Sequence, residues 1–282
     1  MKERKKRDGK SRKKDAKSRA ERADRYALYQ ESVQDPEGDV SRLRRMYARH
    51  FGGAPRHLRE DFCGSALLAC CWVRAGRDHR ATGIDLDPEP LEWGREHNLV
   101  KLRPEQLRRL RLVEADVRAV RGPAADVVAA FNFSYSVFKN RRELLHYFRR
   151  AHAGLARRGI FVLDAYGGPE AQERRAETRE YDGFDYVWDQ DLFDPITHHT
   201  RCLIHFEFSD GSRLERAFRY DWRLWMLPEL RDLLEEAGFD AVEVYWEGTE
   251  RGTDEGNGIF RPRRHAEDDP AWIAYVVAVK GA

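Results

Sequence analysis

Residues 57–73, HLREDFCGSALLACCWV, contain the clearest indication of the fold. The first part of this stretch, residues 57–62, predicts a short strand, and Gly64 interrupts that strand before the small apolar residues 66–73 predict a helix. The following segment repeats this order, because residues 81–86 (ATGIDL) predict a second strand and an Asp-Pro pair then begins a second helix. Two successive strand–helix units are typical of a parallel sheet with helical crossovers.

The rest of the chain continues this alternation and then departs from it. Further strands of the same sheet are predicted at residues 110–115, 126–131 and 160–163, with a helix over 140–155. Antiparallel strands joined by turns are predicted next, at residues 186–193, 201–208 and 213–222. Two last strands are expected at 241–246 and 272–280, separated by a long polar surface loop at 248–270. The predicted fold class is α/β: a Rossmann-like, doubly wound, mostly parallel sheet with a small antiparallel β insertion, residues 181–222, after the fifth strand.

Charge divides the chain into two parts. Residues 1–25 hold 13 Lys and Arg against 5 Asp and Glu, whereas residues 26–282 hold 38 against 44. A segment so poor in large apolar side chains cannot offset the entropy of ordering, so residues 1–25 are predicted to be a disordered basic tail on a folded domain, 26–282. The tail is either a solubilising arm or an electrostatic contact for nucleic acid. It has no aromatic side chain before Tyr26 on which bases could stack.

Several classes of protein are excluded by composition. No apolar run approaches the ~18 residues of a membrane span, and no secretory signal is expected because the N-terminal residues are charged. Four cysteines without a Cys-x-x-Cys pair indicate a reduced, cytoplasmic protein. No metal is expected, because Cys202 and His205 are an odd number of residues apart and would point to opposite faces of a strand.

Candidate binding residues follow the predicted strands, since ligands of open α/β sheets bind at the carboxyl ends of the strands. Glu60 and Gly64 lie at the end of the first strand, and Asp85 follows 21 residues after Gly64 at the end of the second. An acid at this spacing is placed to accept both hydroxyl hydrogens of a ribose. Asp116, after the third strand, is placed to accept from an exocyclic amine such as that of adenine. A dinucleotide is disfavoured because the Gly-x-Gly-x-x-Gly fingerprint is absent, and no P-loop is present in this sheet.

Together these segments resemble the class I S-adenosylmethionine-dependent methyltransferases. Residues 60–66 resemble the first motif of that family, with Gly64 at its middle glycine and Phe62 and Ala66 in place of the other two. The resemblance implies S-adenosyl-L-methionine as cofactor, with Asp85 on the ribose and Asp116 beside the adenine. The expected activity is methyl transfer to a nitrogen or oxygen nucleophile.

The segment FNFSY, residues 131–135, matches the family position at which the methyl group meets its acceptor. It is closest in pattern to the small-molecule glycine/sarcosine-type N-methyltransferases, whose N-terminal helix also carries tyrosines. A small-molecule acceptor is therefore expected. The residues that the resemblance implies for cofactor binding are Tyr29, Arg59, Glu60, Gly64, Asp85, Leu86, Asp116, Val117 and Asn132, and Tyr135 is the candidate on the acceptor side.

Two alternatives remain open from the sequence. One is an RNA- or protein-directed methyltransferase that uses the basic tail. The other is a non-catalytic, RNA-associated protein built on a degenerate methyltransferase fold.

Overall fold

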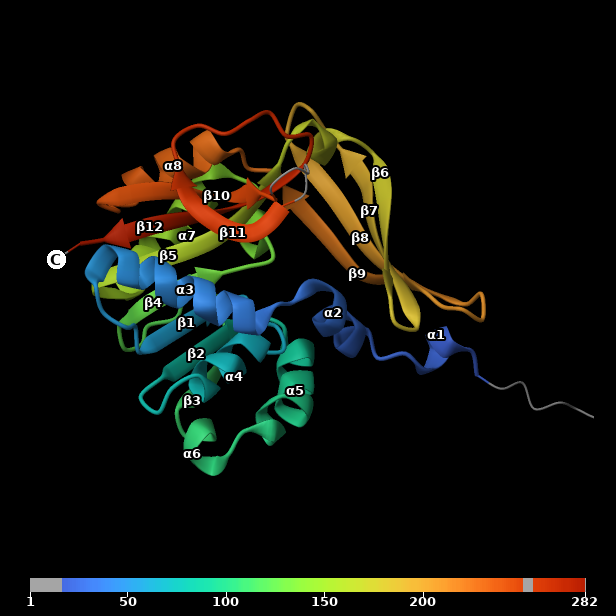
Figure 1. Ribbon diagram of the computed structural model, residues 1–282, viewed down its shortest axis with the longest axis horizontal. Helices are drawn as coiled ribbons and strands as arrows, with labels where there is room; N and C mark the ends of the chain where they lie inside the picture. The colour runs from blue at the N-terminus through green and yellow to red at the C-terminus, as the bar shows by residue number, and fades with distance from the viewer. Residues whose placement is uncertain (1–16, 251–255, 282) are drawn as a thin grey trace, which may run out of the picture.

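The computed structural model describes residues 17–250 and 256–281. Expectations for residues 1–16, the greater part of the basic tail, lie outside the described residues. Within them the strands form two sheets, a large one and a smaller antiparallel one that stands beside it (Figure 1).

The large sheet has the order β11-β10-β12-β5-β4-β1-β2-β3. Its strands are β1 (His57–Asp61), β2 (Arg80–Asp85), β3 (Leu110–Glu114), β4 (Ala125–Ala130), β5 (Leu155–Gly167), β10 (Ala241–Thr249), β11 (Gly256–Arg263) and β12 (Trp272–Lys280). Strands β1 to β5 are parallel, and β12 is antiparallel to both β5 and β10. The strand order reverses between β1 and β4, which is the doubly wound arrangement predicted. In Figure 1 β12 runs to the left, so the parallel strands end on the right, toward the small sheet.

Helices cover the two faces of this sheet and bury two apolar cores. On one face lie α3 (Pro36–Phe51), α4 (Leu67–Arg74) and α5 (Pro88–His97), whose Leu43, Trp72 and Leu91 are fully buried. On the other face lie α7 (Arg141–Gly154) and α8 (Leu227–Glu236), with Leu144 and Leu230 in the core. Two short elements, η1 (Leu99–Lys101) and α6 (Pro104–Leu107), lead from α5 to β3.

The crossover from β3 to β4 contains no helix. Only residues 115–124 connect the two strands, although the chain must pass β2 and β1 to reach the position of β4. A parallel crossover ordinarily uses a dozen or more residues and places a helix over the sheet. Because this crossover has no helix, α7 does not cover the part of its sheet face that carries Thr82 and Arg111. These two side chains line an open cleft.

The antiparallel insertion is larger than predicted. It has the order β6-β7-β8-β9, with β6 (Arg175–Tyr181), β7 (Phe184–Phe193), β8 (His199–Glu207) and β9 (Arg213–Arg223), and the short η3 (Pro169–Gln172) connects it to β5. The sequence prediction began at residue 181 and missed β6. That strand is a polar, largely exposed edge strand, so it has no apolar run to reveal it.

A second correction concerns residues 248–270, predicted to be a surface loop. Within them β11 pairs antiparallel with the end of β10 and forms the edge of the large sheet. Its Phe260 packs edge-on against Tyr275, with ring centroids 4.8 Å apart. Pro262 is tolerated because an edge strand has one side free of ladder hydrogen bonds.

The prediction of disorder up to residue 25 is wrong for its last part. Residues Arg19–Arg22 form α1, which begins with a capping box between Ser18 and Glu21, and α2 (Arg25–Val33) follows it. The Arg19 backbone N–H donates to Asp210, 2.8 Å away in the β8–β9 connection. The sequence could not reveal this contact because its partners are about 190 residues apart.

Candidate functional site

The turn after β1 has the conformation of a glycine-rich motif although it contains one glycine. The backbone angle φ is positive at three alternate residues: Phe62 (58°), Gly64 (50°) and Ala66 (55°). These are the positions at which the family motif carries glycine. A non-glycine residue in this region costs about 1–2 kcal/mol. The two replacements therefore leave the shape of the turn intact.

Local packing offsets that cost at Phe62. Its ring lies against Tyr147 and Phe138, with centroids 5.5 and 6.0 Å away, and so fills space between the sheet and α7. Ala66 is fully buried and its carbonyl accepts from Cys70, the first such bond of α4.

Gly64 and Asp85 are joined directly. The Asp85 carboxylate accepts the Gly64 backbone N–H (2.7 Å) and the Asp87 backbone N–H (2.9 Å), so it connects the turn after β1 to the start of α5. Burial raises the pKa of Asp85, and the two N–H groups oppose that rise. A Cβ atom on Gly64 would meet nothing within 4 Å, which leaves room for a ligand to approach the backbone. Leu86 directly follows Asp85 in the chain, and 69% of its surface is exposed.

The N-terminal helix α2 lies across this turn. The Gln30 side chain donates to Ser65 Oγ at 2.7 Å, and Trp93 of α5 donates to Asp24, the cap of α2, at 2.7 Å. The Tyr29 ring packs on Phe218 of β9, with centroids 4.9 Å apart. Burial raises the pKa of Tyr29 to about 12, and a hydrogen bond with Tyr220 opposes that rise. Helix α2 thus joins the large sheet to the insertion.

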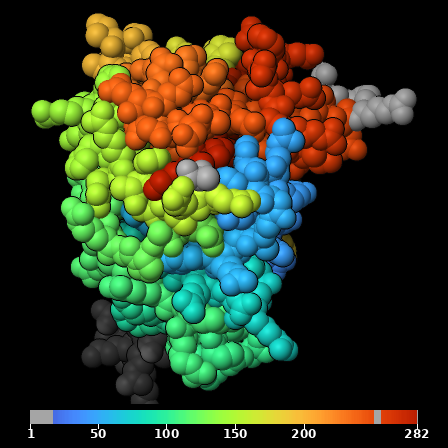
Figure 2. Space-filling model, turned by 90° about the vertical axis from the view of Figure 1, so that its left-hand side faces the viewer, coloured from blue at the N-terminus to red at the C-terminus, as the bar shows by residue number. Residues whose placement is uncertain are grey.

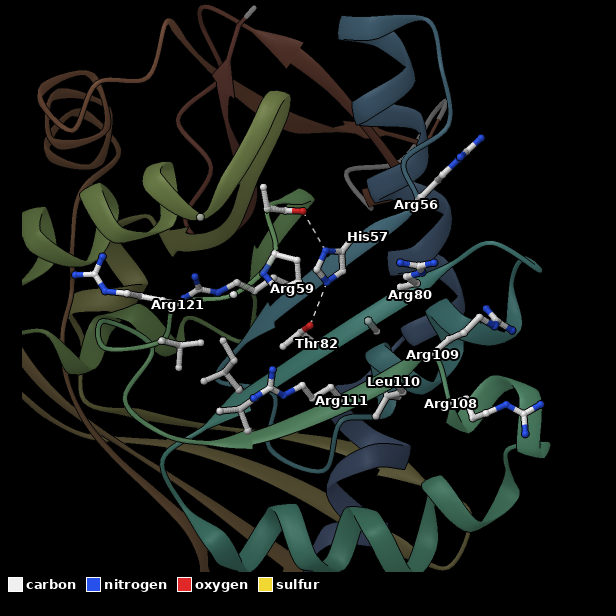
Figure 3. A pocket seen from close by; sticks show the side chains of 18 of the residues that line it. Arg56, His57, Arg59, Arg80, Thr82, Arg108, Arg109, Leu110, Arg111 and Arg121 are labelled. Carbon is white, nitrogen blue, oxygen red and sulfur yellow. Dashed lines mark hydrogen bonds between the residues drawn. The ribbon is translucent and has the colours of Figure 1, made fainter.

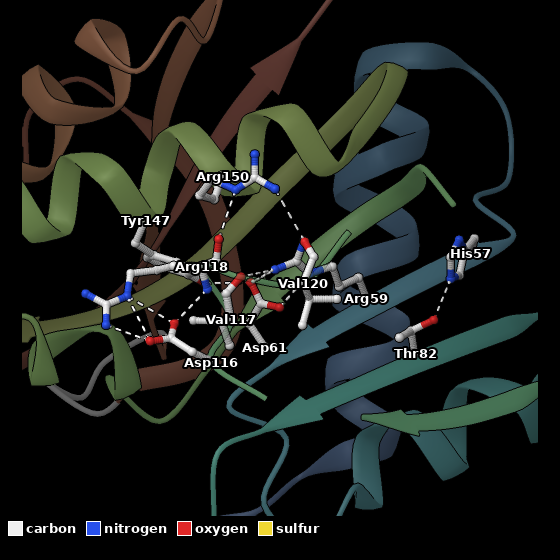
Figure 4. A network of polar contacts seen from close by, with 10 residues as sticks. All are labelled: His57, Arg59, Asp61, Thr82, Asp116, Val117, Arg118, Val120, Tyr147 and Arg150. Atoms are coloured by element: carbon white, nitrogen blue, oxygen red, sulfur yellow. Dashed lines mark hydrogen bonds and ion pairs between the residues drawn. The ribbon is translucent and has the colours of Figure 1, made fainter. Parts of the chain in front are cut away.

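Arg59 is not available to a cofactor carboxylate, which corrects the expectation for this residue. Its Nε donates to Asp61 at 2.7 Å and its guanidinium also donates to the Val117 carbonyl at 2.8 Å, while the Tyr147 hydroxyl donates to Asp61 at 2.9 Å (Figure 4). The pair is buried, with 6% of Arg59 exposed. Arg59 stabilises the region beneath the β3–β4 crossover.

Glu60 is likewise bound within the protein, since one of its carboxylate oxygens accepts the Ala69 backbone N–H of α4 at 2.9 Å. Burial raises the pKa of Glu60 to about 8, with the carboxylates of Asp39 and Asp85 as further causes. It is thus a buried acid directly behind the Gly64 turn.

Asp116 follows β3 and forms an ion pair with Arg118 at 2.6 Å (Figure 4). The bond to Arg118 lowers the pKa of the Asp116 carboxylate. Val117 is buried in the core, and its carbonyl accepts from the Arg59 guanidinium at 2.8 Å. Asp116 and Val117 thus lie just beyond the carboxyl end of β3.

A cavity of about 490 Å³ lies where β4 and β5 end, between α2, α3 and the insertion. Asn132 lines it, and its φ of 56° turns the chain sharply after β4. Aromatic side chains form much of its wall: Tyr29, Phe131, Phe133, Tyr166, Tyr186, Trp188, Tyr220, Trp222, Trp272 and Tyr275. The insertion therefore closes the cavity over the end of the sheet.

Carboxylates are the second feature of this cavity, and sequence reasoning missed them. Asp164, on β5, accepts the backbone N–H groups of Asn132 and Phe133 at 2.8 and 2.9 Å, and burial raises its pKa to about 7. Asp39 pairs with Arg42 at 2.7 Å, and burial raises the Asp39 pKa to about 6. Six acids line the wall against two arginines: Asp35, Asp39, Asp164, Glu170, Glu177 and Glu247 against Arg42 and Arg179. These side chains come from five segments that only the fold brings together.

Tyr135 does not belong to this wall. It lies in η2 (Ser134–Val137), is 2% exposed, and packs in the core beside Phe148. The candidate acceptor-side role for Tyr135 is therefore withdrawn, since a packed ring beneath the cavity cannot touch an acceptor within it.

No group of three or more metal-binding side chains occurs in residues 17–250 and 256–281. In the same residues no helix is long and apolar enough to cross a membrane. The four cysteines are free.

The described architecture is the fold of the S-adenosylmethionine-dependent methyltransferases. Among solved structures, the chain is similar to such a methyltransferase from Clostridium acetobutylicum, at 14% identity, over 91% of this chain and 98% of that one, with a TM-score of 0.63. It is similar to CalS10, an amino pentose methyltransferase from Micromonospora echinaspora solved with bound cofactor, at 17% identity over 90% of this chain and 95% of that one, with a TM-score of 0.64. It is also similar to KedS8, a sugar N-methyltransferase from Streptoalloteichus, at 19% identity over 92% of this chain and 94% of that one, with a TM-score of 0.61. No protein-family model matches the chain, and no curated protein matches it in sequence.

Proposed function

We propose that the protein is an S-adenosyl-L-methionine-dependent methyltransferase whose acceptor is a small molecule with an amine nucleophile. The observation that carries this proposal is the turn at residues 62–66, which keeps three left-handed residues with glycine at only one of them. A chain under no constraint would not keep about 1–2 kcal/mol of strain at each non-glycine position.

The residues around this turn fit the cofactor. The space in front of Gly64 admits a ligand against the backbone, and the free lone pairs of the Asp85 carboxylate suit the two ribose hydroxyls. Leu86 offers an apolar surface and Asp116 an acceptor for the adenine end. Tyr29 and Asn132 line the cavity that begins where this cradle ends, so they suit the methionine end.

The cavity residues favour an amine as acceptor. An amine is cationic at neutral pH, and a wall of aromatic rings and carboxylates attracts such a cation. A protonated amine has no lone pair for attack, so it must first lose a proton. Asp164, with a pKa of about 7 inside the wall, is placed to accept that proton. The cofactor, when bound, supplies a methyl group already activated by its sulfonium, so the protein mainly aligns the reactants and excludes water.

The test is transfer of labelled methyl from S-adenosylmethionine to a panel of small amines and the matching alcohols, with an RNA pool and a protein extract in parallel. We expect label in amines, none in the alcohols, and at least tenfold less transfer by Asp85→Asn when the cofactor concentration lies below its Kd. Label confined to RNA or protein would overturn the small-molecule acceptor, and label in none of the pools would favour the non-catalytic alternative. A cytoplasmic location stays a prediction from the sequence.

A further inference from the structure

A second, larger cleft of about 970 Å³ lies at the end of the large sheet where its parallel strands begin. It is bordered by the first residues of parallel strands, including His57 of β1, Arg80 of β2 and Leu110 of β3 (Figure 3). The Gly64 turn and Asp85 stand at the carboxyl ends of the same strands, so the two sites face opposite ways. Figure 2 views the molecule from this amino-end side.

The missing crossover helix creates this cleft. Thr82 and Arg111 are register partners on β2 and β3, and Arg80 is on the same face two residues before Thr82. A helix between β3 and β4 would cover these side chains. In its absence they line an open cleft, where His57 is held by its two ring nitrogens, 3.1 Å from the Ala124 carbonyl and 3.1 Å from the Thr82 hydroxyl.

Nine arginines line the cleft, and Asp78 is the one carboxylate among its lining residues. Three of the nine are already bound within the protein. Arg59 pairs with Asp61, Arg109 donates to the carbonyls of Val73 and Gly76, and Arg150 donates to that of Arg118.

The other six arginines are exposed and unneutralised. None of them forms an ion pair with a carboxylate in the described part of the chain: Arg56, Arg77, Arg80, Arg108, Arg111 and Arg121. The nearby Asp126 is occupied, because its carboxylate accepts the backbone N–H groups of Arg56 and His57. Like charges brought together without partners destabilise the folded state. Their collection in one cleft is notable because residues 26–282 carry more acidic than basic side chains.

The chemistry of the cleft selects phosphate. The cleft is lined by arginines and by no lysine. The planar guanidinium of arginine binds two phosphate oxygens at once, which a lysine ammonium does not. The six exposed arginines lie at or just before the starts of β1, β2 and β3 and in the β3–β4 crossover. Three neighbouring strands span about 10 Å, so these side chains can contact more than one phosphate. No phenylalanine, tyrosine or tryptophan lines the cleft, so it offers no platform for base stacking. We infer that this arginine cleft binds the phosphodiester backbone of a nucleic acid without regard to sequence.

The test is fluorescence anisotropy of a labelled 20-base-pair RNA duplex with the full chain, over a series of salt concentrations. The variant is Arg80→Ala/Arg111→Ala. The matched control is Arg261→Ala/Arg263→Ala, which removes the same charge from exposed positions of β11, at the other edge of the sheet. Thermal unfolding and S-adenosylhomocysteine binding are measured on all three proteins.

We expect the cleft variant to lose at least tenfold in RNA affinity at ~100 mM salt, because two phosphate contacts are removed. The slope of log K against log salt should fall by about 2, since each neutralised phosphate contributes about 0.9. The control should bind as the wild type does, and cofactor binding should be unchanged in both. Equal RNA binding by all three proteins would assign the binding to the tail and overturn the inference. Displacement of the duplex by inorganic tripolyphosphate at micromolar concentration would also overturn it, in favour of a small-anion site. None of these RNA-binding results bears on the proposed methyl transfer, which the labelling experiment tests by itself.

Discussion

Replacing Asp85 with asparagine tests the cofactor site at its most specific atoms. The carboxylate already accepts two backbone N–H groups, one on each oxygen, at 2.7 and 2.9 Å. Its remaining lone pairs are those that a ribose would use. Asparagine has one acceptor oxygen in place of two, so it loses one charge-assisted bond to the ribose and leaves one N–H of the turn without its acceptor.

The expected loss follows from these bonds. A hydrogen bond to a charged group contributes about 1.5–3 kcal/mol, which corresponds to a roughly 10- to 150-fold rise in Kd. The unpaired N–H should also lower the free energy of unfolding by about 1–2 kcal/mol. The protein should therefore stay folded while its affinity for the cofactor falls.

The assay is calorimetric titration with S-adenosylhomocysteine, with thermal unfolding on the same samples. Asp87→Asn is the matched control, because Asp87 lies in the same loop and caps α5 by accepting the Glu89 N–H at 2.9 Å. Asparagine caps a helix as well as aspartate does, so this control should bind like the wild type. An Asp85→Asn protein with wild-type affinity would refute the assignment of Asp85 to the ribose.

Three further predictions address the turn, its buried acid and the N-terminus. Gly64→Ala should cost about 1–2 kcal/mol of unfolding free energy, because alanine is strained at a φ of 50° although its Cβ meets no atom within 4 Å, and it should lower cofactor affinity at least tenfold, as urea unfolding and calorimetry would show. The raised pKa of Glu60 stabilises the fold below pH ~4.5, and this contribution is lost as pH rises toward 8. The unfolding free energy of the wild type should thus fall relative to that of Glu60→Gln by about 1 kcal/mol per pH unit from pH 5 to 8. The same pH dependence of unfolding in both proteins would contradict this. Deleting residues 1–16 should leave the melting temperature unchanged, whereas deleting 1–24 should lower it by removing the contacts of Arg19 and Asp24; equal melting of both truncations would mean that α1 contributes nothing.

The sequence predicted most of the large sheet because its central strands are buried on both faces and read as apolar runs. It also placed Gly64 and Asp85 at the ends of the first two strands, and the structure joins them by a hydrogen bond because these strands are adjacent and parallel. The sequence did not predict β6 and β11, because both are largely exposed edge strands without a run of buried apolar residues.

The sequence predicted the directions of individual side chains less well than the strands. Arg59 alternates away from Glu60 along β1, so it pairs with Asp61 beneath the crossover and cannot reach the cofactor site. Tyr135 was chosen because residues 131–135 match the family position at which the methyl group meets its acceptor, yet its side chain packs in the core. The acids of the cavity are far apart in the chain, and no local pattern indicates that Asp39 and Asp164 share one wall.

We propose that S-adenosylmethionine binds between the Gly64 turn and Asp85. The decisive experiment is a crystal structure of the protein grown with S-adenosylhomocysteine. We expect the ribose hydroxyls within hydrogen-bond distance of the Asp85 carboxylate, the backbone of Gly64 against the ligand, and the sulfur facing the cavity lined by Asn132 and Asp164. Ligand density elsewhere, such as in the arginine cleft, or no density at millimolar ligand, would contradict the account.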